Sequence, residues 1–309
     1  MPERKTKIIK MEDVPAFLKD ALSKGGRLLI GGNGYGNRPN ALVRQIVTAG
    51  IRNLSLFGGP VNANDVDMLV AVGAVKETFC PMVSALQFGM APNWRKAAET
   101  GTIVANGIDQ PSTLAGLMAA DLGIPYMPLA CMKGTDLVKV HPLLKKYTPP
   151  FGGEDLYAVQ AIRPDLAIIH APAADIYGNV RDGSRGSSHL VAKASQRVLV
   201  SVDRIIPYEE TLRNPEETTI PCRYVAAVVE IPYGAHPAGC TGGYAPDTDH
   251  LREYWQAAAS NAQGDTKLFQ AYLDKYVLGP SSNFDYMERI GGAKRLWELQ
   301  RGASAGAAE

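Results

Sequence analysis

The stretch that decides the fold is LLIGGNGYGNRPNALV, residues 28–43. A short apolar run leads into a loop with four glycines, and a helical pattern begins after Pro39. This order predicts a strand, a flexible turn and the N-terminus of a helix, the arrangement that holds phosphates in nucleotide-binding folds. The first question is therefore whether this loop is built for a dinucleotide or for another ligand.

The glycine spacing argues against a dinucleotide. The dinucleotide fingerprint is G-x-G-x-x-G, followed about 20 residues later by a carboxylate at the end of the next strand. Here Gly32, Gly34 and Gly36 are two residues apart, and the next apolar run ends at 57–59 in Phe-Gly-Gly, without a carboxylate. No Lys-Ser or Lys-Thr pair follows the last glycine, which excludes a Walker-type phosphate loop. Two interpretations stay open: a plain tight turn, or a loop that lets a ligand approach the backbone closely.

Outward from this loop, strand patterns alternate with helix patterns as far as residue 232. Apolar runs such as 53–59, 75–80 and 197–206 are spaced by amphipathic stretches, which is typical of a mostly parallel sheet covered by helices. Only helical patterns follow after that region, at 247–261, 265–276, 283–290 and 292–300. We therefore predict a single α/β domain over residues 1–309, with three α/β/α layers, a helical C-terminal cap and a frayed tail at 303–309.

Residues 125–153 break the alternation with a run rich in proline and glycine. Proline removes a backbone donor and glycine weakens regular structure, so we expect a long irregular loop here. A loop of that length in a compact domain is usually functional.

The composition excludes several classes of partner. The 309 residues carry 32 basic and 31 acidic side chains, for a formal net charge of +1, and no charge run stands out. Such a balance argues against a nucleic-acid partner. The sequence has neither an apolar run of membrane-spanning length nor a signal-like N-terminus, so we expect a cytoplasmic protein without a membrane partner.

The cysteines and histidines do not predict a metal site. Cys80, Cys131, Cys222 and Cys240 lie far apart without a C-x-x-C pair, so we expect buried free thiols. We expect His170, at the end of an apolar run, to be a core residue and His236 to belong to a structural turn, whereas His189 and His250 are expected at the surface or as helix caps. No histidine pair has metal-ligand spacing, and no G-x-S-x-G nucleophile elbow is present. The chain thus combines a ligand-type loop with an incomplete catalytic set.

Six stretches resemble the α subunit of family I coenzyme A transferases, of the glutaconate CoA-transferase type. They are GGNGYGNRP (31–39), GGPVNANDVDMLVAVGAVK (58–76), LMAADLGIPYMPLACMKGTDL (117–137), AIRPDLAIIHAPAADIYGNV (161–180), VAAVVEIPYGAHPAGCTGGYAPD (225–247) and FDYMERIGGAKRL (284–296). The likeness extends from about residue 12 to 300, in order. PYGAHPAGC is the most specific of these motifs, whereas the glycine loop alone is a weak one.

The resemblance implies an α/β/α subunit of the CoA-transferase/NagB-like superfamily that pairs with a homologous β subunit. In this family a β-subunit glutamate attacks the acyl-CoA thioester, forms an acyl-glutamyl anhydride and then carries the CoA as a glutamyl thioester. This chain would then hold no catalytic residue and no permanently bound cofactor. Coenzyme A and a small carboxylic or dicarboxylic acid would be its substrates.

Two groups of residues are expected to bind substrate: the resemblance implies the first, and the second is chosen for its polar side chains. The backbone of the glycine loop is expected to line the acyl pocket at the subunit interface, through Gly32, Asn33, Gly34, Tyr35 and Gly36. Ser84 and Gln87, in the loop PMVSALQFG, are expected to contact the substrate carboxylate, with an ordinary surface loop as the alternative. We expect Gly34→Val to lower activity with little loss of folding; the alternative is that Gly34 and Gly36 only supply positive φ, in which case the variant would unfold. The contact with the β subunit is expected to involve the loops 32–39, 84–92 and 233–246, and the alternative for 233–246 is a loop buried inside the same chain.

Three other functions stay open. In ring-degrading CoA hydrolases of the superfamily an α-subunit glutamate acts near the position of ANGIDQPS, residues 105–112, where this chain has only Asp109, a typical helix cap. The second possibility is a binding subunit without catalytic function. The third is a sugar-phosphate isomerase, which shares the strand, glycine loop and helix but needs a paired acid and base that the sequence does not offer.

Overall fold

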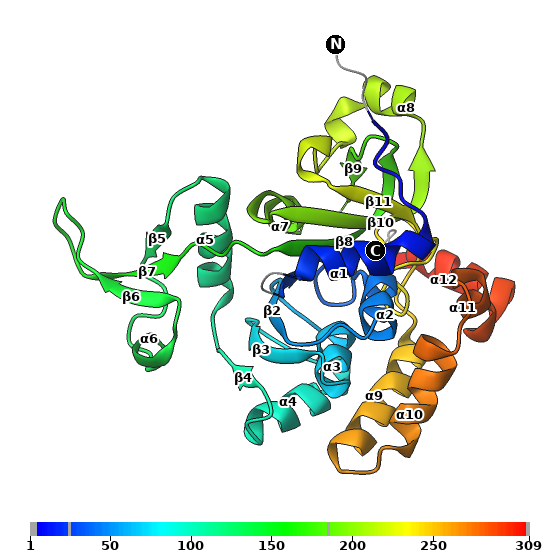
Figure 1. The fold of residues 1–309 in the computed structure, drawn as a ribbon, viewed down its shortest axis with the longest axis horizontal. Coiled ribbons are helices and arrows are strands. Elements are labelled where there is room, and N and C mark those ends of the chain that lie inside the picture. The colour runs from blue at the N-terminus through cyan, green and yellow to red at the C-terminus, as the bar shows by residue number, and fades with distance from the viewer. Residues whose placement is uncertain (1–4, 24–25, 184–185, 307–309) are drawn as a thin grey trace.

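The computed structural model describes residues 5–23, 26–183 and 186–306, and its centre is an eight-stranded sheet (Figure 1). Along the sheet the strands follow the order β11, β10, β8, β1, β2, β3, β4, and β9 pairs with β8. All neighbours in that row are parallel, whereas β9 is antiparallel to β8. The bounds are β1 Arg27–Ile30, β2 Leu54–Gly58, β3 Val75–Phe79, β4 Val104–Ala105, β8 Leu166–Asp175, β9 Val180–Arg181, β10 Arg197–Ile206 and β11 Ala227–Glu230.

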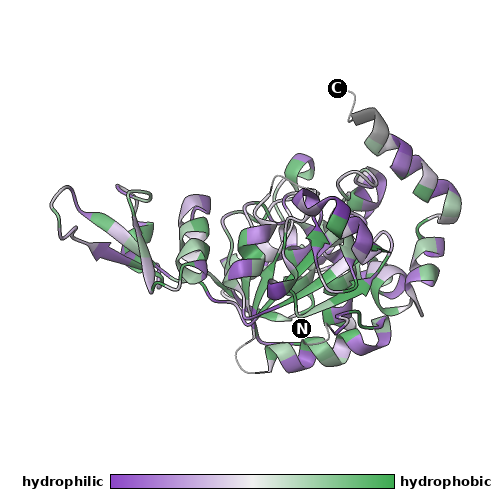
Figure 2. Ribbon diagram, turned by 90° about the horizontal axis from the view of Figure 1, so that it is seen from above, coloured by the Kyte–Doolittle hydropathy of each residue, from purple (hydrophilic) through white to green (hydrophobic). Residues whose placement is uncertain are grey.

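Helices cover both faces of this sheet, as the alternation predicted. Successive side chains of a strand point to opposite faces: Leu28 and Ile30 of β1 pack into one apolar cluster and Leu29 into the other. The first cluster lies under α1 Val14–Leu22, α2 Asn40–Thr48, α3 Asn64–Ala71 and α4 Pro92–Glu99, and the second under α5 Gln110–Asp121 and α7 Ser188–Ala194. Figure 2 shows the strands as the most hydrophobic layer. The three-layer architecture is confirmed.

The C-terminal region is helical, as predicted, and it packs on the first cluster. Its helices are α9 Thr248–Ala262, α10 Lys267–Leu273, α11 Asn283–Arg289 and α12 Gly292–Gly306, and a short π-helical turn, Asp274–Leu278, follows α10. Outside this region, the short helix α8 Tyr208–Arg213 follows β10. The Tyr254 hydroxyl donates to Asp67 on α3 over 2.8 Å and so fastens α9 to the domain. Helix α12 continues through Gly306, and the rest of the expected frayed tail, 307–309, lies outside the described residues.

The expectation of an irregular loop at 125–153 was wrong. The segment belongs to an arm, residues 126–160, in which β5 Tyr126–Leu129, β7 Leu156–Gln160 and β6 Leu144–Tyr147 form an antiparallel sheet, with α6 Leu137–Val140 beside it. Figure 1 shows the arm extending away from the central sheet. The prolines misled the prediction because Pro128 lies on an edge strand, where a missing N–H costs no ladder bond, and Pro149 lies in the turn between β6 and β7.

Candidate functional site

Three loops meet the glycine loop at the carboxyl edge of the sheet, where ligands bind in open parallel sheets. The Gly34 amide donates to Val61 after β2 over 3.0 Å, and the Asn37 amide donates to Gly239 after β11 over 2.9 Å. The Tyr35 hydroxyl donates to the Ala85 carbonyl, after β3, over 2.8 Å. The glycine loop therefore lies at the centre of the site, packed against the ends of three other strands.

The loop itself is a tight reciprocal turn. Asn33 and Gly36 exchange two backbone hydrogen bonds of 3.0 and 2.9 Å. Gly32 has φ of +84°, and a Cβ there would lie 2.7 Å from the Asn37 carbonyl oxygen, so Gly32 is required by the turn itself. Gly34 has φ of +54°, and a Cβ there would meet only Leu86, at 3.5 Å.

These dihedral angles show that Gly36 is a better position than Gly34 for a substitution that tests ligand binding. Valine at position 34 would strain the backbone, since a β-branched residue is a genuine outlier at positive φ, so the expected tolerance of folding to Gly34→Val was wrong. Gly36 is outside the left-handed region, and a Cβ there would touch only the Asn33 carbonyl oxygen, at 3.4 Å. Substitution of Gly36 therefore fills ligand space with less disturbance of the turn.

A pocket of about 280 Å³ opens on one side of the turn. Its lining consists of glycine backbone, an amide and hydroxyl groups, from Gly32, Asn33, Gly36, Gly186, Ser187, Ser188 and Thr241. The pocket thus brings together three of the residues expected to bind substrate and adds Ser187, Ser188 and Thr241, which the sequence did not single out. Among the described residues, the lining contains no carboxylate.

The other expected substrate-binding residues lie elsewhere. Tyr35 is buried, and its hydroxyl accepts from the Trp255 ring nitrogen over 2.7 Å while donating to Ala85. The Ser84 hydroxyl accepts from the Leu86 amide over 2.9 Å and shapes its own turn, whereas Gln87 is exposed. The pocket described above is lined without Tyr35, Ser84 or Gln87.

A buried ion pair that sequence reasoning missed holds the glycine loop in place. Arg38 and Asp65 are both fully buried and form a salt bridge. The Arg38 guanidinium also donates to the carbonyl oxygens of Gly32 and Val61, each over 3.2 Å. In the sequence, the position of Arg38 directly before Pro39 was the only indication of this ion pair. Its partner Asp65 could not be identified because it lies 27 residues further along the chain.

Asn37 is a second missed residue, and it joins three segments behind the pocket. Its side-chain nitrogen donates to the backbone and carboxylate oxygens of Asp182, over 2.9 and 2.8 Å. Its side-chain oxygen accepts from the Thr241 amide over 2.8 Å. Asn37 adopts φ of +50°, a conformation that asparagine tolerates better than most residues. Thr241 is thereby positioned at the pocket.

The loop 233–246 is mostly interior, against the expectation that it forms an interface. Residues 234–240 are buried within this chain, and the Tyr244 hydroxyl accepts from the Ala235 amide over 3.0 Å. Its exposed residues are Thr241, Gly242 and Pro246. The low charge of this loop thus reflects packing inside the domain.

The histidines near this loop are structural. His236 is buried between the Tyr286 hydroxyl, 2.7 Å away, and the Asp247 carboxylate, 3.1 Å away, as its structural role predicted, and burial lowers its pKa. Burial alone would raise the pKa of Asp247, but the hydrogen bonds from Arg295 and His236 outweigh it and hold that pKa below its usual range. His250 is also buried, 2.8 Å from the Tyr272 hydroxyl, so its expected surface or capping role was wrong. The side chain that caps α9 is Asp247.

Asp109, the carboxylate at the hydrolase position, caps a helix. Its side chain accepts a hydrogen bond of 3.0 Å from the Ser112 amide at the start of α5. Such a cap satisfies one of the free amides of the first helical turn. The cap role expected from the sequence is confirmed.

No helix among the described residues is long and apolar enough to span a bilayer.

Comparison with known proteins gives consistent matches along the chain. The profile of the family described as "Coenzyme A transferase" matches residues 12–231. The A subunit of glutaconate CoA-transferase from Acidaminococcus fermentans is 32% identical over 305 residues, which cover 92% of this chain and 93% of that protein. The crystal structure of glutaconate coenzyme A-transferase from the same organism matches with a TM-score of 0.85 and 30% identity, covering 96% of both chains.

Two further relatives also match most of this chain. An uncharacterized protein of Archaeoglobus fulgidus is 31% identical over 297 residues, and the match covers 94% of this chain but only 63% of that longer protein. The cholesterol ring-cleaving hydrolase IpdA subunit of Mycobacterium tuberculosis is 28% identical over 308 residues, covering 96% of this chain and all of that one. Given the family profile and the full-length likeness to a glutaconate CoA-transferase chain, this protein belongs to the coenzyme A transferase family.

Proposed function

We propose that this chain is the α subunit of a heteromeric CoA-transferase that moves CoA between an acyl-CoA and a small carboxylic or dicarboxylic acid. The observation that carries the proposal is the glycine-loop pocket, whose described lining offers hydroxyl, amide and backbone groups but no carboxylate. Transfer of CoA through a covalent intermediate needs a nucleophile. A pocket that binds without supplying one fits a subunit whose nucleophile comes from a partner.

In this proposal a glutamate of the partner attacks the thioester carbonyl, and CoA leaves as the thiolate with formation of an acyl-glutamyl anhydride. The CoA thiolate then attacks the glutamyl carbonyl and releases the acid, which leaves a glutamyl-CoA thioester. The acceptor acid completes the exchange by the reverse sequence. Coenzyme A is therefore a substrate here, and no resident cofactor takes part.

The contribution of this chain is to bind and orient the acid. Ser187, Ser188 and Thr241 line the pocket from two segments. The serine hydroxyls can donate to a carboxylate, whereas the Thr241 hydroxyl donates to Asn37 over 3.1 Å and helps to fix this wall of the pocket. Gly32, Asn33 and Gly36 form its floor, where the absence of side chains at the two glycines lets an acyl group approach the backbone. We assign the acyl pocket to these six residues.

The other residues expected to bind substrate belong, in this proposal, to the surface that faces the partner subunit. They are Gly34, Tyr35, Ser84 and Gln87. The glycine loop contacts the loop after β3 through the hydrogen bond from Tyr35 to Ala85. Beside this contact, Met82, Leu86 and Met90 expose apolar side chains. Exposed apolar groups next to a ligand loop are typical of an interaction site. We propose that the partner subunit covers this surface and brings its nucleophile to the pocket there, so Ser84 and Gln87 would meet substrate only in the complex.

The test is production of the chain with and without a homologous β subunit, followed by assay of CoA transfer from acetyl-CoA to a panel of small acids. We expect the isolated chain to be inert and the pair to form new acyl-CoA esters, detected by mass spectrometry. Turnover by the chain alone would overturn the two-subunit proposal.

A hydrolase subunit is the second candidate, because the Mycobacterium hydrolase subunit matches along the full chain. The two functions differ in product: a transferase conserves the thioester, whereas a hydrolase releases free CoA. Substitution of Asp109 also distinguishes the two functions. Asp109→Asn keeps most of the helix cap but removes the carboxylate that a hydrolase could use as a base. We expect Asp109→Asn to leave transfer unchanged, and a loss of turnover with intact folding would favour the hydrolase.

A further inference from the structure

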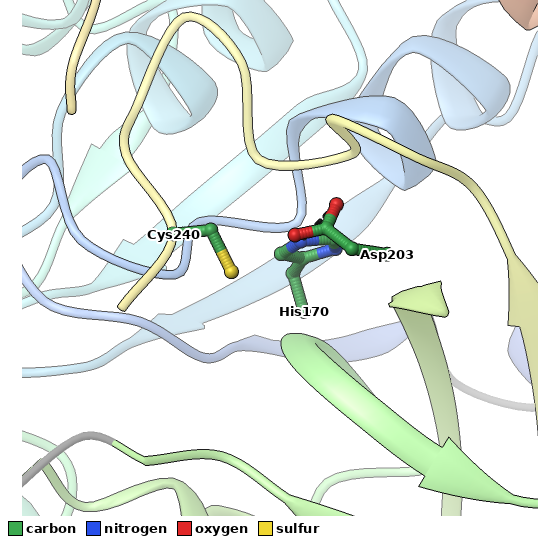
Figure 3. Close-up of side chains that lie close together, drawn as sticks. All are labelled: His170, Asp203 and Cys240. Atoms are coloured by element: carbon green, nitrogen blue, oxygen red, sulfur yellow. Dashed lines mark ion pairs between the residues drawn. The ribbon is translucent and has the colours of Figure 1, made fainter. Parts of the chain in front are cut away.

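Three metal-binding side chains from separate segments meet at the carboxyl edge of the sheet. They are His170 on β8, Asp203 on the neighbouring strand β10 and Cys240 in the loop after β11 (Figure 3). One nitrogen, one oxygen and the sulfur all lie within 4.8 Å of one another. This cluster is separate from the pocket lining, although Cys240 directly precedes Thr241 in the chain.

The groups on the other side of the His170 ring are compatible with the tautomer that a metal ligand needs. Its Nδ1 lies 2.9 Å from the Ser201 hydroxyl, and that hydroxyl donates its hydrogen to the Ile169 carbonyl over 3.4 Å. With the Ser201 hydrogen directed to Ile169, the ring donates from Nδ1 to Ser201, and this tautomer leaves Nε2 free to bind a cation. The Nε2 atom is left with a lone pair. A second partner that fixes the tautomer in this way is typical of metal-binding histidines.

That lone pair faces another acceptor. His170 Nε2 and Asp203 Oδ1 are 3.4 Å apart, and neither buried atom has a hydrogen-bond partner among the described residues. In the tautomer with the proton on Nδ1 these are two bare acceptors that repel each other, whereas buried polar groups are normally paired. The His170 ring is held in this orientation, because its side chain is fully buried and its Nδ1 lies 2.9 Å from the Ser201 hydroxyl. A cation between the two atoms would satisfy both.

The spacing suits zinc. With bonds of about 2.0–2.1 Å to nitrogen and oxygen, a tetrahedral zinc ion places those two ligand atoms about 3.3 Å apart. The Cys240 sulfur lies within 4.8 Å of both atoms and would have to move by at most about 1.3 Å to reach the equivalent spacing. Nitrogen, oxygen and sulfur together are donors for zinc and related transition metals, whereas calcium and magnesium prefer oxygen alone.

We propose that His170, Asp203 and Cys240 bind one zinc ion, with a fourth position open toward the turn at 241–243. Gly243 borders that approach, since a Cβ there would lie 3.7 Å from Asp203 Oδ2. The site would tie the loop that carries Thr241 to two strands of the sheet. Burial and the Asp203 carboxylate raise the pKa of the Cys240 thiol, and a bound cation would reverse this by favouring the thiolate. The proposal stands independently of the proposed function.

The test uses the full chain without an affinity tag, freed of metal with a chelator and titrated with Zn²⁺ against a chromogenic competitor. We expect one equivalent to bind with a Kd below about 1 µM. A parallel Co²⁺ titration should give the absorption of tetrahedral cobalt with a thiolate charge-transfer band. Cys240→Ser should abolish that band and weaken Zn²⁺ binding at least about tenfold, and His170→Gln should do the same to the affinity.

Cys80→Ser is the matched control, because Cys80 is the other buried free cysteine among the described residues and lies outside the cluster. It should leave the stoichiometry, the affinity and the cobalt spectrum unchanged. Circular dichroism melting of each variant checks folding, and Cys240→Ser preserves the shape of the side chain. Binding that is weaker than about 10 µM, or equal in all variants, would overturn the proposal and leave a proton shared between His170 and Asp203 as the explanation.

Discussion

The carboxyl-edge loops and the arm, residues 126–160, differ in where their stability comes from. The glycine loop ends in Asn37 and Arg38, which are buried and whose side-chain amide and terminal guanidinium nitrogens donate to other segments of this chain. In the arm, Leu144 and Val159 are buried opposite each other, but Phe151 is fully exposed and Val140 is 77% exposed. The glycine loop is thus held in place by contacts within this chain, whereas the arm leaves apolar side chains exposed.

This difference shows that glycine and proline mark two unlike structures in one chain. At the edge of the main sheet they allow close packing, as at Gly32, where a side chain has no room. In the arm they bound short strands that have little interior of their own. Substitutions at the edge should therefore change the stability of the domain, and substitutions in the arm should change its association.

The largest effect is expected from Asp65→Ala. This change leaves the Arg38 guanidinium buried without its counter-charge, which typically destabilises a protein by about 3–5 kcal/mol. The free energy of unfolding, measured by denaturant titration, should fall by that amount.

The matched control is Glu99→Ala, which removes an exposed ion pair with Arg95 on α4. Surface pairs of this kind contribute about 0–1 kcal/mol. Equal effects of the two substitutions would contradict the idea that the glycine loop is held from within.

A pair of alanine substitutions in the glycine loop should separate folding from binding. In Gly32→Ala the Cβ would lie 2.7 Å from the Asn37 carbonyl oxygen at φ of +84°, a strain of about 1–3 kcal/mol. Gly36→Ala has no such clash and should retain stability but lower activity with the partner, because it narrows the pocket. Thermal melting and the transfer assay are both needed. Normal activity of Gly36→Ala in a folded complex would remove Gly36 from the proposed pocket.

Much of the main sheet could be predicted because its signals are local. Each strand such as Leu54–Gly58 is a short apolar run that ends at a turn residue, and each helix shows its own period. The arm escaped prediction because a proline on an edge strand looks the same in sequence as a proline in a loop. His250 was misplaced for a related reason: its helix starts at the surface, but the Tyr272 side chain covers it from another helix.

The site was predictable only in its backbone. The glycine loop is recognisable over a few residues, but Arg38 and Asp65, or Asn37 and Thr241, are joined by the fold and not by spacing. The same holds for the proposed zinc ligands, which come from three segments. Sequence spacing identifies metal sites when the ligands are local, and here they are not.

The stability of the C-terminal cap should depend on pH. Burial and the neighbouring His236 lower the pKa of His250 well below its usual value, so the folded state binds fewer protons than the unfolded state as the pH falls. The resulting stabilisation is complete above about pH 6.5 and is lost below it, by up to about 1.4 kcal/mol per pH unit for one histidine. His250→Gln should flatten this slope in denaturant titrations at several pH values, whereas substitution of the exposed His189 should not. Equal slopes in all three proteins would contradict the assignment.

The smallest effect on stability is expected from Phe151→Ser, at the tip of the arm. Because this side chain is fully exposed, its removal should change the free energy of unfolding by less than about 0.5 kcal/mol. Apolar groups exposed in one subunit are commonly covered in an assembly, and an obligate interface buries more than about 2,000 Å² with a core-like composition. Phe151→Ser combined with Val140→Ser should therefore weaken assembly with the partner, measured by light scattering after size exclusion, while Lys146→Ser on the same arm should not. Unchanged assembly of the double variant would show that the arm lies outside the interface, and the partner would then have to bind through the loops beside the pocket alone.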